Sequence, residues 1–374
     1  MRYVNELPAE RLHGKRVLVR AGFDVALTDG EVSEVFRIEK GLPTLKLLKD
    51  AGARVVILSH IGRKPEDTNA PVARALKKFL PVIYVPDISG TQARAAVEAM
   101  KEGDVLLLEN LRRDEREVAN DGLFAGELAQ LGDLYVNDAF SNSHREHASM
   151  VRLPKLLPSY AGLLLRDEVE HLAKALKPPR PSLAIIGGAK FETKDPVIQL
   201  FLQSYDDVCV VGAIANDVLK ARGFPVGRSR VSEHAPDEKV ANHPRLLAPD
   251  DVVVERLDGQ VLTKKPRAVL EDDLIADIGP ESVAELAPLI EKAKFILWNG
   301  PTGIFEHGFN AQTQTIAEFI SKSGAEKIIG GGDTIAAIEK AGVPLKNLGF
   351  VSTGGGAMLE YLLKRTLPAI KALG

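Results

Sequence analysis

Short runs of apolar residues, most of them β-branched, recur along this chain and are separated by stretches long enough to form a helix. Strands that are apolar on both faces are typical of parallel sheets covered by helices on each side. The sequence therefore predicts an α/β protein of the doubly wound type. The runs are residues 17–19, 55–58, 105–108, 134–136, 183–186, 208–211, 252–254, 295–298, 328–329 and 350–351.

The length of the chain indicates more than one domain. It has 374 residues, which exceeds what one hydrophobic core usually supports. Apolar residues near helical spacing at 158–176 precede a proline-rich turn at 177–181 and indicate a connecting helix. We expect two doubly wound parallel-sheet (Rossmann-like) domains joined by this helix and a hinge, with bounds of 1–157, 158–177 for the interdomain helix, and 178–356.

Composition excludes several classes of protein. The net charge of −3 argues against a surface coated with positive charge for nucleic acid or anionic membranes. The single cysteine, Cys209, lies in an apolar run, where a buried structural thiol is expected rather than a nucleophile. No signal-peptide pattern and no apolar stretch of membrane-spanning length are present. We therefore expect a cytoplasmic protein without nucleic-acid or membrane partners and, by default, a monomer.

Two glycine-rich turns follow apolar runs near the C-terminal end, and each precedes a helix-forming stretch. They are Gly-Gly-Gly-Asp-Thr at 330–334 and Ser-Thr-Gly-Gly-Gly at 352–356. Glycine lets the backbone approach an anion closely, and the N-terminus of the following helix presents free N–H groups to it. One such turn alone is more often a tight turn without a ligand. Two together, the first with an Asp–Thr pair suited to Mg²⁺ and phosphate oxygen, favour a nucleotide site.

Basic residues follow the apolar runs of the first domain. In open parallel sheets ligands bind at the carboxyl ends of the strands. His60 and Arg63 follow one run, Arg112 follows another, the segment 137–147 follows a third, and Arg37 lies after the first. A single arginine of this kind is usually a solvated surface residue. Their shared placement favours a small-anion site, because guanidinium groups bind phosphate and carboxylate bidentately.

The strand ends of the second domain carry glycine instead of arginine. Glycines occur at 187–188, 212 and 300–303, an arrangement suited to a nucleotide whose phosphates rest on backbone amides. Lys190 and Lys194 can neutralise phosphate charge. The chain has no Walker A sequence, no protein-kinase H-R-D set and no G-x-G-x-x-G after its first strand. One domain suited to a small anion and another suited to a nucleotide together predict phosphoryl transfer.

Taken together, the motifs resemble those of the phosphoglycerate kinase family, in the family's order and over essentially the whole chain. The resemblance implies reversible transfer of a phosphoryl group between 1,3-bisphosphoglycerate and ADP, giving 3-phosphoglycerate and ATP with Mg²⁺, the ATP-forming step of glycolysis. It also implies that residues 357–374 return to the first domain. The matching segments are residues 59–63, 107–112, 135–140, 144–149, 187–190, 298–301, 330–334 and 352–356.

The resemblance also implies roles for individual residues. Arg37 and Lys190 would be the catalytic residues that flank the moving phosphoryl group. Phosphoryl transfer depends on positioning and charge neutralisation, which explains the need for cations and helix N-termini. The phosphoglycerate site is implied at Arg37, His60, Arg63, Arg112, His144, Arg145 and His147. The nucleotide site is implied at Lys194, Gly212, Asn299, Pro301, Glu306 (on the ribose), Gly331, Gly332, Asp333 (also on the metal) and Thr334, with a phosphate at Gly354, Gly355 and Gly356.

The first strand end departs from the family pattern. Where the family has Arg-Val-Asp-Phe-Asn-Val-Pro, residues 20–26 read Arg-Ala-Gly-Phe-Asp-Val-Ala. The substrate-facing Asp position is thus Gly22, and the Asn position is Asp24. Residues two apart share a face of an extended backbone, so we hypothesise that Asp24 accepts from the substrate hydroxyl. The alternative is that Asp24 pairs with a neighbouring arginine.

Other functions remain open at this point. A catalytically impaired nucleotide-binding or regulatory protein on the same scaffold is one alternative, suggested by Gly22 and Asp24. A nicotinamide dehydrogenase and a nucleic-acid-binding protein are two others, although the dinucleotide fingerprint is missing. The active form is expected to require domain closure about the connecting helix, because the two kinds of motif lie on different domains. The sequence leaves the preference between ADP and GDP undecided.

Overall fold

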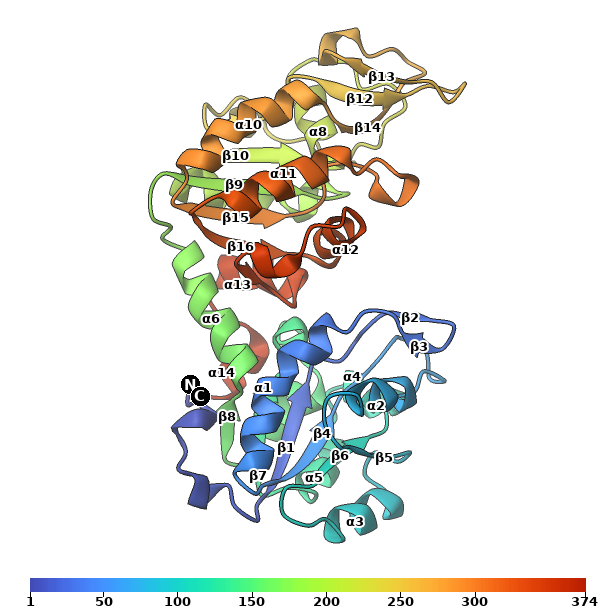
Figure 1. Ribbon diagram of the computed structural model, residues 1–374, viewed down its shortest axis with the longest axis vertical. Coiled ribbons are helices and arrows are strands. Elements are labelled where there is room, and N and C mark those ends of the chain that lie inside the picture. The colour runs from blue at the N-terminus through green and yellow to red at the C-terminus, as the bar shows by residue number, and fades with distance from the viewer. The chain divides into compact units, whose positions relative to one another are not determined.

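The computed structural model describes residues 1–374, which form two compact units. The first unit comprises Met1–Glu170 and Lys364–Gly374, and the second comprises His171–Leu363. Each unit is built on a six-stranded sheet whose strands are all parallel (Figure 1). The predicted α/β fold class with two parallel sheets is therefore confirmed. The domain bounds given from the sequence stay predictions.

The sheet of the first unit has the strand order β5-β6-β4-β1-β7-β8. Strand β1 lies inside the sheet, with β4, β6 and β5 on one side of it and β7 and β8 on the other; because the strands are parallel, the carboxyl ends of β1, β4, β6 and β7 meet at one edge. A two-stranded hairpin, β2 and β3, lies outside it. The bounds are β1 Arg16–Ala21, β2 Leu27–Thr28, β3 Glu31–Val32, β4 Arg54–Leu58, β5 Ile83–Val85, β6 Val105–Leu108, β7 Leu134–Asp138 and β8 Ser159–Ala161.

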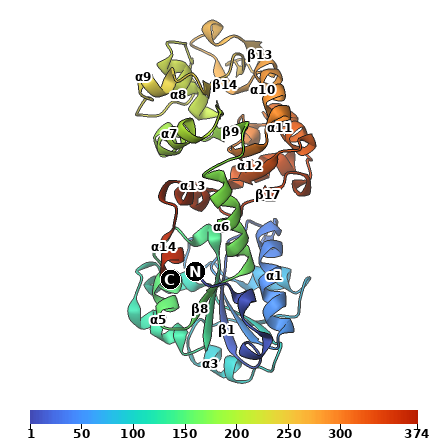
Figure 2. The same cartoon turned by 90° about the vertical axis from the view of Figure 1, so that its left-hand side faces the viewer.

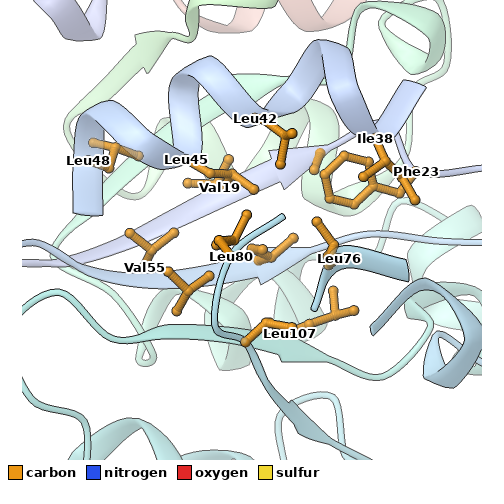
Figure 3. Packing of buried hydrophobic residues seen from close by; sticks show 14 of the residues in the cluster. Val19, Phe23, Ile38, Leu42, Leu45, Leu48, Val55, Leu76, Leu80 and Leu107 are labelled. Carbon is orange, nitrogen blue, oxygen red and sulfur yellow. The ribbon is translucent and has the colours of Figure 1, made fainter. Parts of the chain in front are cut away.

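Helices cover both faces of this sheet, with α1 on one side and α5 on the other (Figure 2). On the α1 side, Leu42 and Leu45 pack with Val19 and Val55 of the sheet, all almost fully buried (Figure 3). Burying each such side chain stabilises the fold by about 1.5–3 kcal/mol. The helices are α1 Phe36–Asp50, α2 Ala70–Leu76, α3 Thr91–Glu98, α4 Glu115–Val118, α5 Gly122–Ala129 and α14 Pro368–Ala372, with short helical turns at Val4–Glu6, Ala9–Arg11, Leu111–Arg113, Phe140–Asn142, Ala148–Arg152 and Leu153–Lys155.

The sheet of the second unit has the order β11-β10-β9-β15-β16-β17. Its strands are β9 Ser182–Gly187, β10 Asp207–Val211, β11 Leu246–Leu247, β15 Phe295–Asn299, β16 Glu326–Gly330 and β17 Phe350–Val351. Helices α7 and α8 lie on one side of it, and α10 and α11 lie on the other (Figure 2). The helices are α7 Asp195–Ser204, α8 Ala213–Ala221, α9 Glu238–Ala241, α10 Pro280–Lys292, α11 Ala311–Lys322, α12 Gly332–Lys340 and α13 Gly355–Lys364, with short turns at Phe191–Thr193, Pro266–Ala268, Phe305–His307 and Leu345–Asn347.

One predicted strand has a different place. The run at 252–254 was expected in a parallel sheet, but β12 (Val252–Glu255) is the middle strand of a separate antiparallel sheet with β13 (Val261–Lys264) and β14 (Leu274–Ile278). Val252 and Val254 are buried in a small separate core, whereas Val253 between them is only half-buried. The apolar composition of this segment therefore does not distinguish a strand buried on one face from a strand buried on both faces.

Helix α6 spans Leu163–Ala175 and starts later than the expected position 158, because Ser159–Ala161 pair with β7 as strand β8. At its N-terminal end the N–H of Leu164 donates to Asp138 Oδ1 at 2.9 Å within the first unit. At its C-terminal end the Tyr205 hydroxyl donates to the carbonyl of Ala175 at 3.0 Å within the second. Both ends of the helix are thus anchored in their own unit. None of the helices combines the length and apolar character needed to cross a membrane.

Candidate functional site

The basic residues of the first unit converge at the carboxyl edge of its sheet. Asp24 follows β1, His60 follows β4, Arg112 follows β6 and Arg145 follows β7, while Arg37 lies in the first turn of α1. Asp24 acts electrostatically on each of the other groups or is acted on by it, and exposed Arg63 is within reach of Arg112 and Arg145. The doubly wound topology brings these side chains together, since it aligns the ends of neighbouring strands.

Asp24 is the acidic member of this cluster. Its Oδ1 accepts from the N–H of Gly62 at 3.0 Å, and its Oδ2 lies 3.5 Å from His60 Nε2. Arg37 donates to the backbone carbonyl of Asp24 and is close enough to act on its carboxylate electrostatically. Burial alone would raise the pKa of Asp24, but His60, the Gly62 N–H and Arg37 together lower it to about 2. Asp24 is therefore ionised at neutral pH.

The arginines outnumber this one carboxylate. Arg112 donates from Nη1 to the carbonyl of Gly62 at 2.6 Å, while its buried Nε has no hydrogen-bond partner. Arg145 likewise has a buried Nη1 without a partner. Burial and then the neighbouring arginines lower the pKa of Arg112, and burial does the same for Arg145, with Arg63 and Arg37 adding to the effect. A cluster of cations with unused donors is suited to a multiply charged anion.

The two predicted histidines lie beside these arginines. His147 is buried, and its Nδ1 lies 3.9 Å from Glu117 Oε1. Burial, then Arg20 and Arg112, lower the pKa of His147 to about 4. It is therefore neutral near pH 7 and contributes hydrogen-bonding groups rather than charge. His144 is half-buried and close enough to influence His147.

The structure gives a reason for the unusual Gly22. A Cβ at this position would lie 2.9 Å from Ser141 Oγ and 3.5 Å from Ala139 Cα. The residues that follow β7 thus occupy the space that a side chain at position 22 would need. A side chain at position 22 would therefore require the hydroxyl of Ser141 to move.

Three buried polar residues beneath the basic cluster were not predicted. Arg20 is fully buried in β1, and Glu117 and Ser149 are fully buried beside it. A signal for Arg20 was present, since a charged residue directly follows the apolar run 17–19. Glu117 and Ser149 have no such signal, because only the packing of α4 and the turn at 148–152 brings them under the sheet edge.

In the second unit the two glycine-rich turns contact each other. Helix α12 starts at Gly332 and α13 starts at Gly355, as the turns predict. A Cβ on Gly355 would lie 2.4 Å from Gly331 Cα, and Gly331 itself has a φ of +107°. Glycine is thus required at Gly355 by close backbone approach and at Gly331 by the positive φ. The N–H groups in the first turn of each helix have no intrahelical acceptor and are available to an anion. The N–H of Gly354 lies 3.3 Å from Ser352 Oγ.

Side chains from β15 and α12 hold the first turn in place. Thr334 Oγ1 donates to the carbonyl of Gly330 at 2.9 Å and accepts from the N–H of Gly300 at 2.7 Å. Asn299 Nδ2 also donates to Gly330, at 2.8 Å. The hydroxyl of Thr334 is therefore engaged within the protein, and its predicted contribution to a nucleotide site falls to its backbone N–H.

Two charged residues lie next to this turn. Lys194 donates from Nζ to Asn299 Oδ1 at 3.2 Å. Burial lowers the pKa of Lys194, an effect that Asp333 opposes. Lys190 is exposed on the loop after β9, where Thr193 Oγ1 donates to its carbonyl at 2.8 Å. The two predicted lysines therefore differ, since Lys194 is held beside the turn and Lys190 points to solvent.

A cavity of about 410 Å³ adjoins these groups. Its size lies in the range of ligand-binding pockets. Its lining includes the predicted residues Gly212, Pro301, Glu306 and Asp333. Its lining also includes apolar residues from α8, β12 and β14 that the sequence did not predict; they are Leu219, Val252, Leu274, Ile275 and Ala276.

The donor set available to a metal ion in this unit is small. No three His, Cys, Asp or Glu residues lie together as a metal site. Asp333, in the first turn of α12 and at the wall of the cavity, offers one carboxylate. Mg²⁺ usually binds proteins through one or two carboxylates, with phosphates and water as the other ligands. The residues present therefore fit a Mg²⁺ ion that shares Asp333 with the phosphates of a nucleotide.

The fold and the two sites define a class of protein, a phosphotransferase of two doubly wound domains. Comparison with known proteins identifies the family. The family model described as phosphoglycerate kinase matches residues 7–365. The phosphoglycerate kinase of Moorella thermoacetica is 43% identical over 385 residues, covering 97% of each chain. That of Wolbachia from Drosophila simulans is 39% identical over 383 residues, covering 97% of this chain and 96% of the relative.

Solved structures agree. Phosphoglycerate kinase from Coxiella burnetii has a TM-score of 0.82 at 36% identity, covering 99% of this chain and 97% of its own. The enzyme from Pyrococcus horikoshii OT3 has a TM-score of 0.89 at 30% identity, covering 100% of this chain and 98% of its own. The chain belongs to the phosphoglycerate kinase family. It is a kinase of glycolysis that transfers a phosphoryl group reversibly between 1,3-bisphosphoglycerate and ADP, giving 3-phosphoglycerate and ATP. Nothing in the comparisons favours a catalytically impaired protein.

Proposed function

We propose that the basic cluster of the first unit binds the phosphoglycerate and that the glycine turns and cavity of the second unit bind the nucleotide with Mg²⁺. The observation that carries this assignment is the excess of arginines over carboxylates in the first cluster. Arg112 and Arg145 keep buried N–H groups without partners there, which supports a site completed by an anion. Phosphate and carboxylate are the groups that guanidinium forks bind best.

Within the first site, different side chains bind different parts of the substrate. Arg63, Arg112 and Arg145, with His144 and His147 beside them, bind the phosphate and carboxylate ends of the phosphoglycerate. His60 donates hydrogen bonds at the base of the site. Arg37, in the first turn of α1, faces the phosphoryl group that moves. All of these groups are cations or neutral donors, as binding of a multiply charged anion requires.

Within the second site, backbone groups do most of the binding. The apolar residues that line the cavity receive the base, Glu306 binds the ribose, and the N–H groups at Gly331–Thr334 and Gly354–Gly356 bind the phosphates. Mg²⁺, when bound with the nucleotide, neutralises charge on the phosphate oxygens. Asp333 would hold it, and Lys194 places a further positive charge beside the turn. Lys190, on the loop after β9, would reach the transferred phosphoryl group.

The first test concerns the proposed role of Arg37 at the transferred phosphoryl group. A coupled assay follows 1,3-bisphosphoglycerate formation from 3-phosphoglycerate and ATP with Mg²⁺ for the wild type and for Arg37→Ala. We expect kcat to fall about 100-fold or more, because a charge that stabilises the transition state is lost. The matched control is Arg74→Ala, which removes an exposed arginine paired with Glu31 in the same unit. Equal rates in both variants would refute the assignment.

The second test concerns Asp24 and the substrate hydroxyl. The Asp24→Asn variant keeps the side-chain shape but weakens acceptance from a hydroxyl. We expect the KM for 3-phosphoglycerate to rise about tenfold, the worth of one hydrogen bond to a charged group. Unchanged KM and kcat would sink this hypothesis and leave Asp24 as the partner of His60 and Gly62 only.

The third test separates Asp333 from other helix-terminal acids. In Asp333→Asn we expect the Mg²⁺ concentration for half-maximal rate to rise about tenfold, because the carboxylate ligand is lost. The control is Glu281→Gln, which removes an acid from the first turn of α10 in the same unit. A Mg²⁺ dependence that is the same in Asp333→Asn as in the wild type would argue against the ligand role.

Catalysis also requires the two substrates to meet. We propose that the units close about α6 during turnover, supported by the location of the two sites on different units. Small-angle scattering with both substrates should give a smaller radius of gyration than with either alone, and identical curves would contradict closure. The monomeric state and the cytoplasmic location stay predictions, which sedimentation and cell fractionation can test.

A further inference from the structure

A chain of buried polar side chains runs from the interior of the first unit to the base of the basic cluster. Glu117, Ser149, Arg20 and His60 are almost fully buried, and Asp24 ends the chain at the site. Ser149 Oγ donates to Glu117 Oε1 at 2.5 Å and accepts from Arg20 Nε at 2.9 Å. Arg20 Nη2 then lies 2.7 Å from His60 Nδ1, and His60 Nε2 lies 3.5 Å from Asp24 Oδ2.

The inner end of this chain is fully satisfied. Glu117 Oε2 accepts from the N–H of Ser149 at 2.9 Å, and Arg20 Nη1 donates to the carbonyl of Ala21 at 2.6 Å. The Tyr135 hydroxyl donates to the carbonyl of Ser149 at 2.8 Å. Arg20 and Glu117 thus form a buried pair of opposite charges bridged by one hydroxyl. Such a pair costs desolvation energy and is weak support for stability, so a role in positioning has to be considered.

The contact between Arg20 and His60 determines the state of the imidazole. A guanidinium group has five N–H donors and no acceptor. Nδ1 of His60 must therefore accept, which means that it carries no proton. The ring is then neutral, and its single proton is on Nε2, facing Asp24. An imidazolium would place an N–H against an N–H at 2.7 Å.

We propose that Arg20, held through Ser149 by Glu117, is a positioning residue that keeps His60 neutral with its proton on Nε2. This inference rests on the proposed phosphoglycerate site, because His60 and Asp24 are its members. The fixed tautomer turns its one N–H toward Asp24, whose Oδ2 is 3.5 Å away, and because Nε2 makes no hydrogen bond within the protein this donor is open to the substrate.

On balance, the charged groups that face His60 favour the neutral form of its imidazole ring. Arg20 lies on β1, Asp24 follows β1, and Arg112 follows β6; of these only Asp24 favours a charged ring. Burial, with Arg20 and Arg112, lowers the pKa of His60 to about 3 against the opposing effect of Asp24. The protein thus avoids a histidine that titrates near neutral pH in its substrate site, where an unperturbed imidazole would change charge.

Ring-¹⁵N NMR of histidine in the intact, ligand-free protein tests the tautomer directly. The protein has eight histidines, and the spectrum of His60→Gln assigns the resonance of interest. We expect protonated Nε2 and unprotonated Nδ1 throughout the range from about pH 5 to 9. A proton on Nδ1, or an imidazolium at neutral pH, would overturn the proposal. This result does not depend on which ligand the site binds, so it is separable from the Arg37→Ala test.

Kinetics then separate positioning from a purely structural role. The double variant Arg20→Met, Glu117→Gln removes both buried charges together, so neither is left unpaired. We expect His60 to titrate at higher pH in this variant, and the ratio of its KM for 3-phosphoglycerate to the wild-type KM to change about threefold or more between about pH 6 and 8. Taking the ratio cancels the titration of the substrate's own phosphate.

A matched control removes another charge pair from the same strand. Arg16→Met, Asp133→Asn deletes an ion pair at the opposite end of β1, with Nη2 and Oδ1 2.6 Å apart. We expect its KM ratio to be independent of pH. A flat ratio in the folded Arg20–Glu117 double variant would contradict the proposal. If that variant does not fold, Ser149→Ala takes its place, since it keeps both charges and removes only the hydroxyl that bridges them. The ring-¹⁵N spectrum of the wild type still tests which nitrogen of His60 carries the proton.

Discussion

The two units have the same sheet architecture, but the anion sites proposed for them are of opposite kinds. At the strand ends of the first unit, arginine and histidine side chains surround the site. At the strand ends of the second unit, glycines let backbone N–H groups and helix N-termini do so. The first site holds cations such as Arg112 and Arg145, whose pKa values burial lowers. The second depends on backbone contacts such as that between Gly331 and Gly355.

The difference teaches how each kind of site relates to stability. Side-chain cations that repel one another in a partly buried site destabilise the protein; Asp24 offsets part of this repulsion, and a bound anion would offset the rest. A site made of backbone groups is part of the packing itself, so its loss affects the fold as well as binding. Substitutions in the first unit should therefore separate activity from stability, and substitutions in the second should not.

The largest expected effect is that of Gly300→Ala in the second unit. Gly300 has a φ of +106°, and a Cβ there would lie 2.4 Å from the carbonyl carbon of Gly187. We expect a loss of about 3 kcal/mol or more in unfolding free energy, because two strand ends must separate. Urea denaturation measures it.

The control for this prediction lies in the same loop. Gly308 has a φ of +93°, but its Cβ would meet no atom within 4 Å. Gly308→Ala should cost only the backbone strain, about 1–2 kcal/mol. Equal losses in the two variants would show that φ alone, rather than close packing of backbone, makes glycine necessary at Gly300.

The next effect is that of Arg112→Ala in the first unit. We expect kcat/KM for 3-phosphoglycerate to fall about 100-fold, which corresponds to about 2.7 kcal/mol. Thermal unfolding should show unchanged or slightly higher stability, because a partly buried cation among like charges is removed. Arg113→Ala, which removes the neighbouring arginine paired with Glu109, should keep full activity. A marked fall in the stability of Arg112→Ala would break the contrast between the units.

A third prediction concerns Asp277, a buried acid of the second unit that has a counterpart, Asp138, in the first. Burial raises the pKa of Asp138 and of Asp277 to about 7, although hydrogen bonds from backbone N–H groups oppose it in both. A raised folded-state pKa stabilises the protein at low pH, and this stability is lost as pH rises through about 7. We expect the wild type to lose about 2 kcal/mol relative to Asp277→Asn between about pH 5 and 8. Parallel pH profiles would contradict this.

The smallest effect concerns Asp24, whose folded-state pKa is lowered to about 2. A lowered pKa adds stability above the unfolded value of 3.8 and loses it as pH falls toward 2. Asp24→Asn should therefore be about 1 kcal/mol less stable at neutral pH, after allowance for solvent at a side chain that is 31% exposed. Urea denaturation at several pH values should show the difference shrinking below about pH 4. If the difference in unfolding free energy between the wild type and Asp24→Asn were the same at every pH, the charge of Asp24 would not be its cause.

Much of the fold was predictable because strand and turn signals are local. The apolar runs became strands, and the turn at 330–334 leads into α12 as expected. The run at 252–254 was placed wrongly, since apolar composition alone does not report whether one face of a strand or both are buried. The walls of the cavity, such as Leu219 and Ile275, were not predicted because three separate segments contribute them.

The sequence by itself determined the class of fold, the family and the residues that carry charge to the strand ends, since each depends on short motifs. Only the tertiary structure decided how those residues act on one another. It showed that Asp24 faces His60, that Ser141 fills the space beside Gly22, and that Arg20 lies between His60 and the buried Glu117. These relations join residues far apart in the chain. Packing and burial determine them, and neither is a property of a local segment.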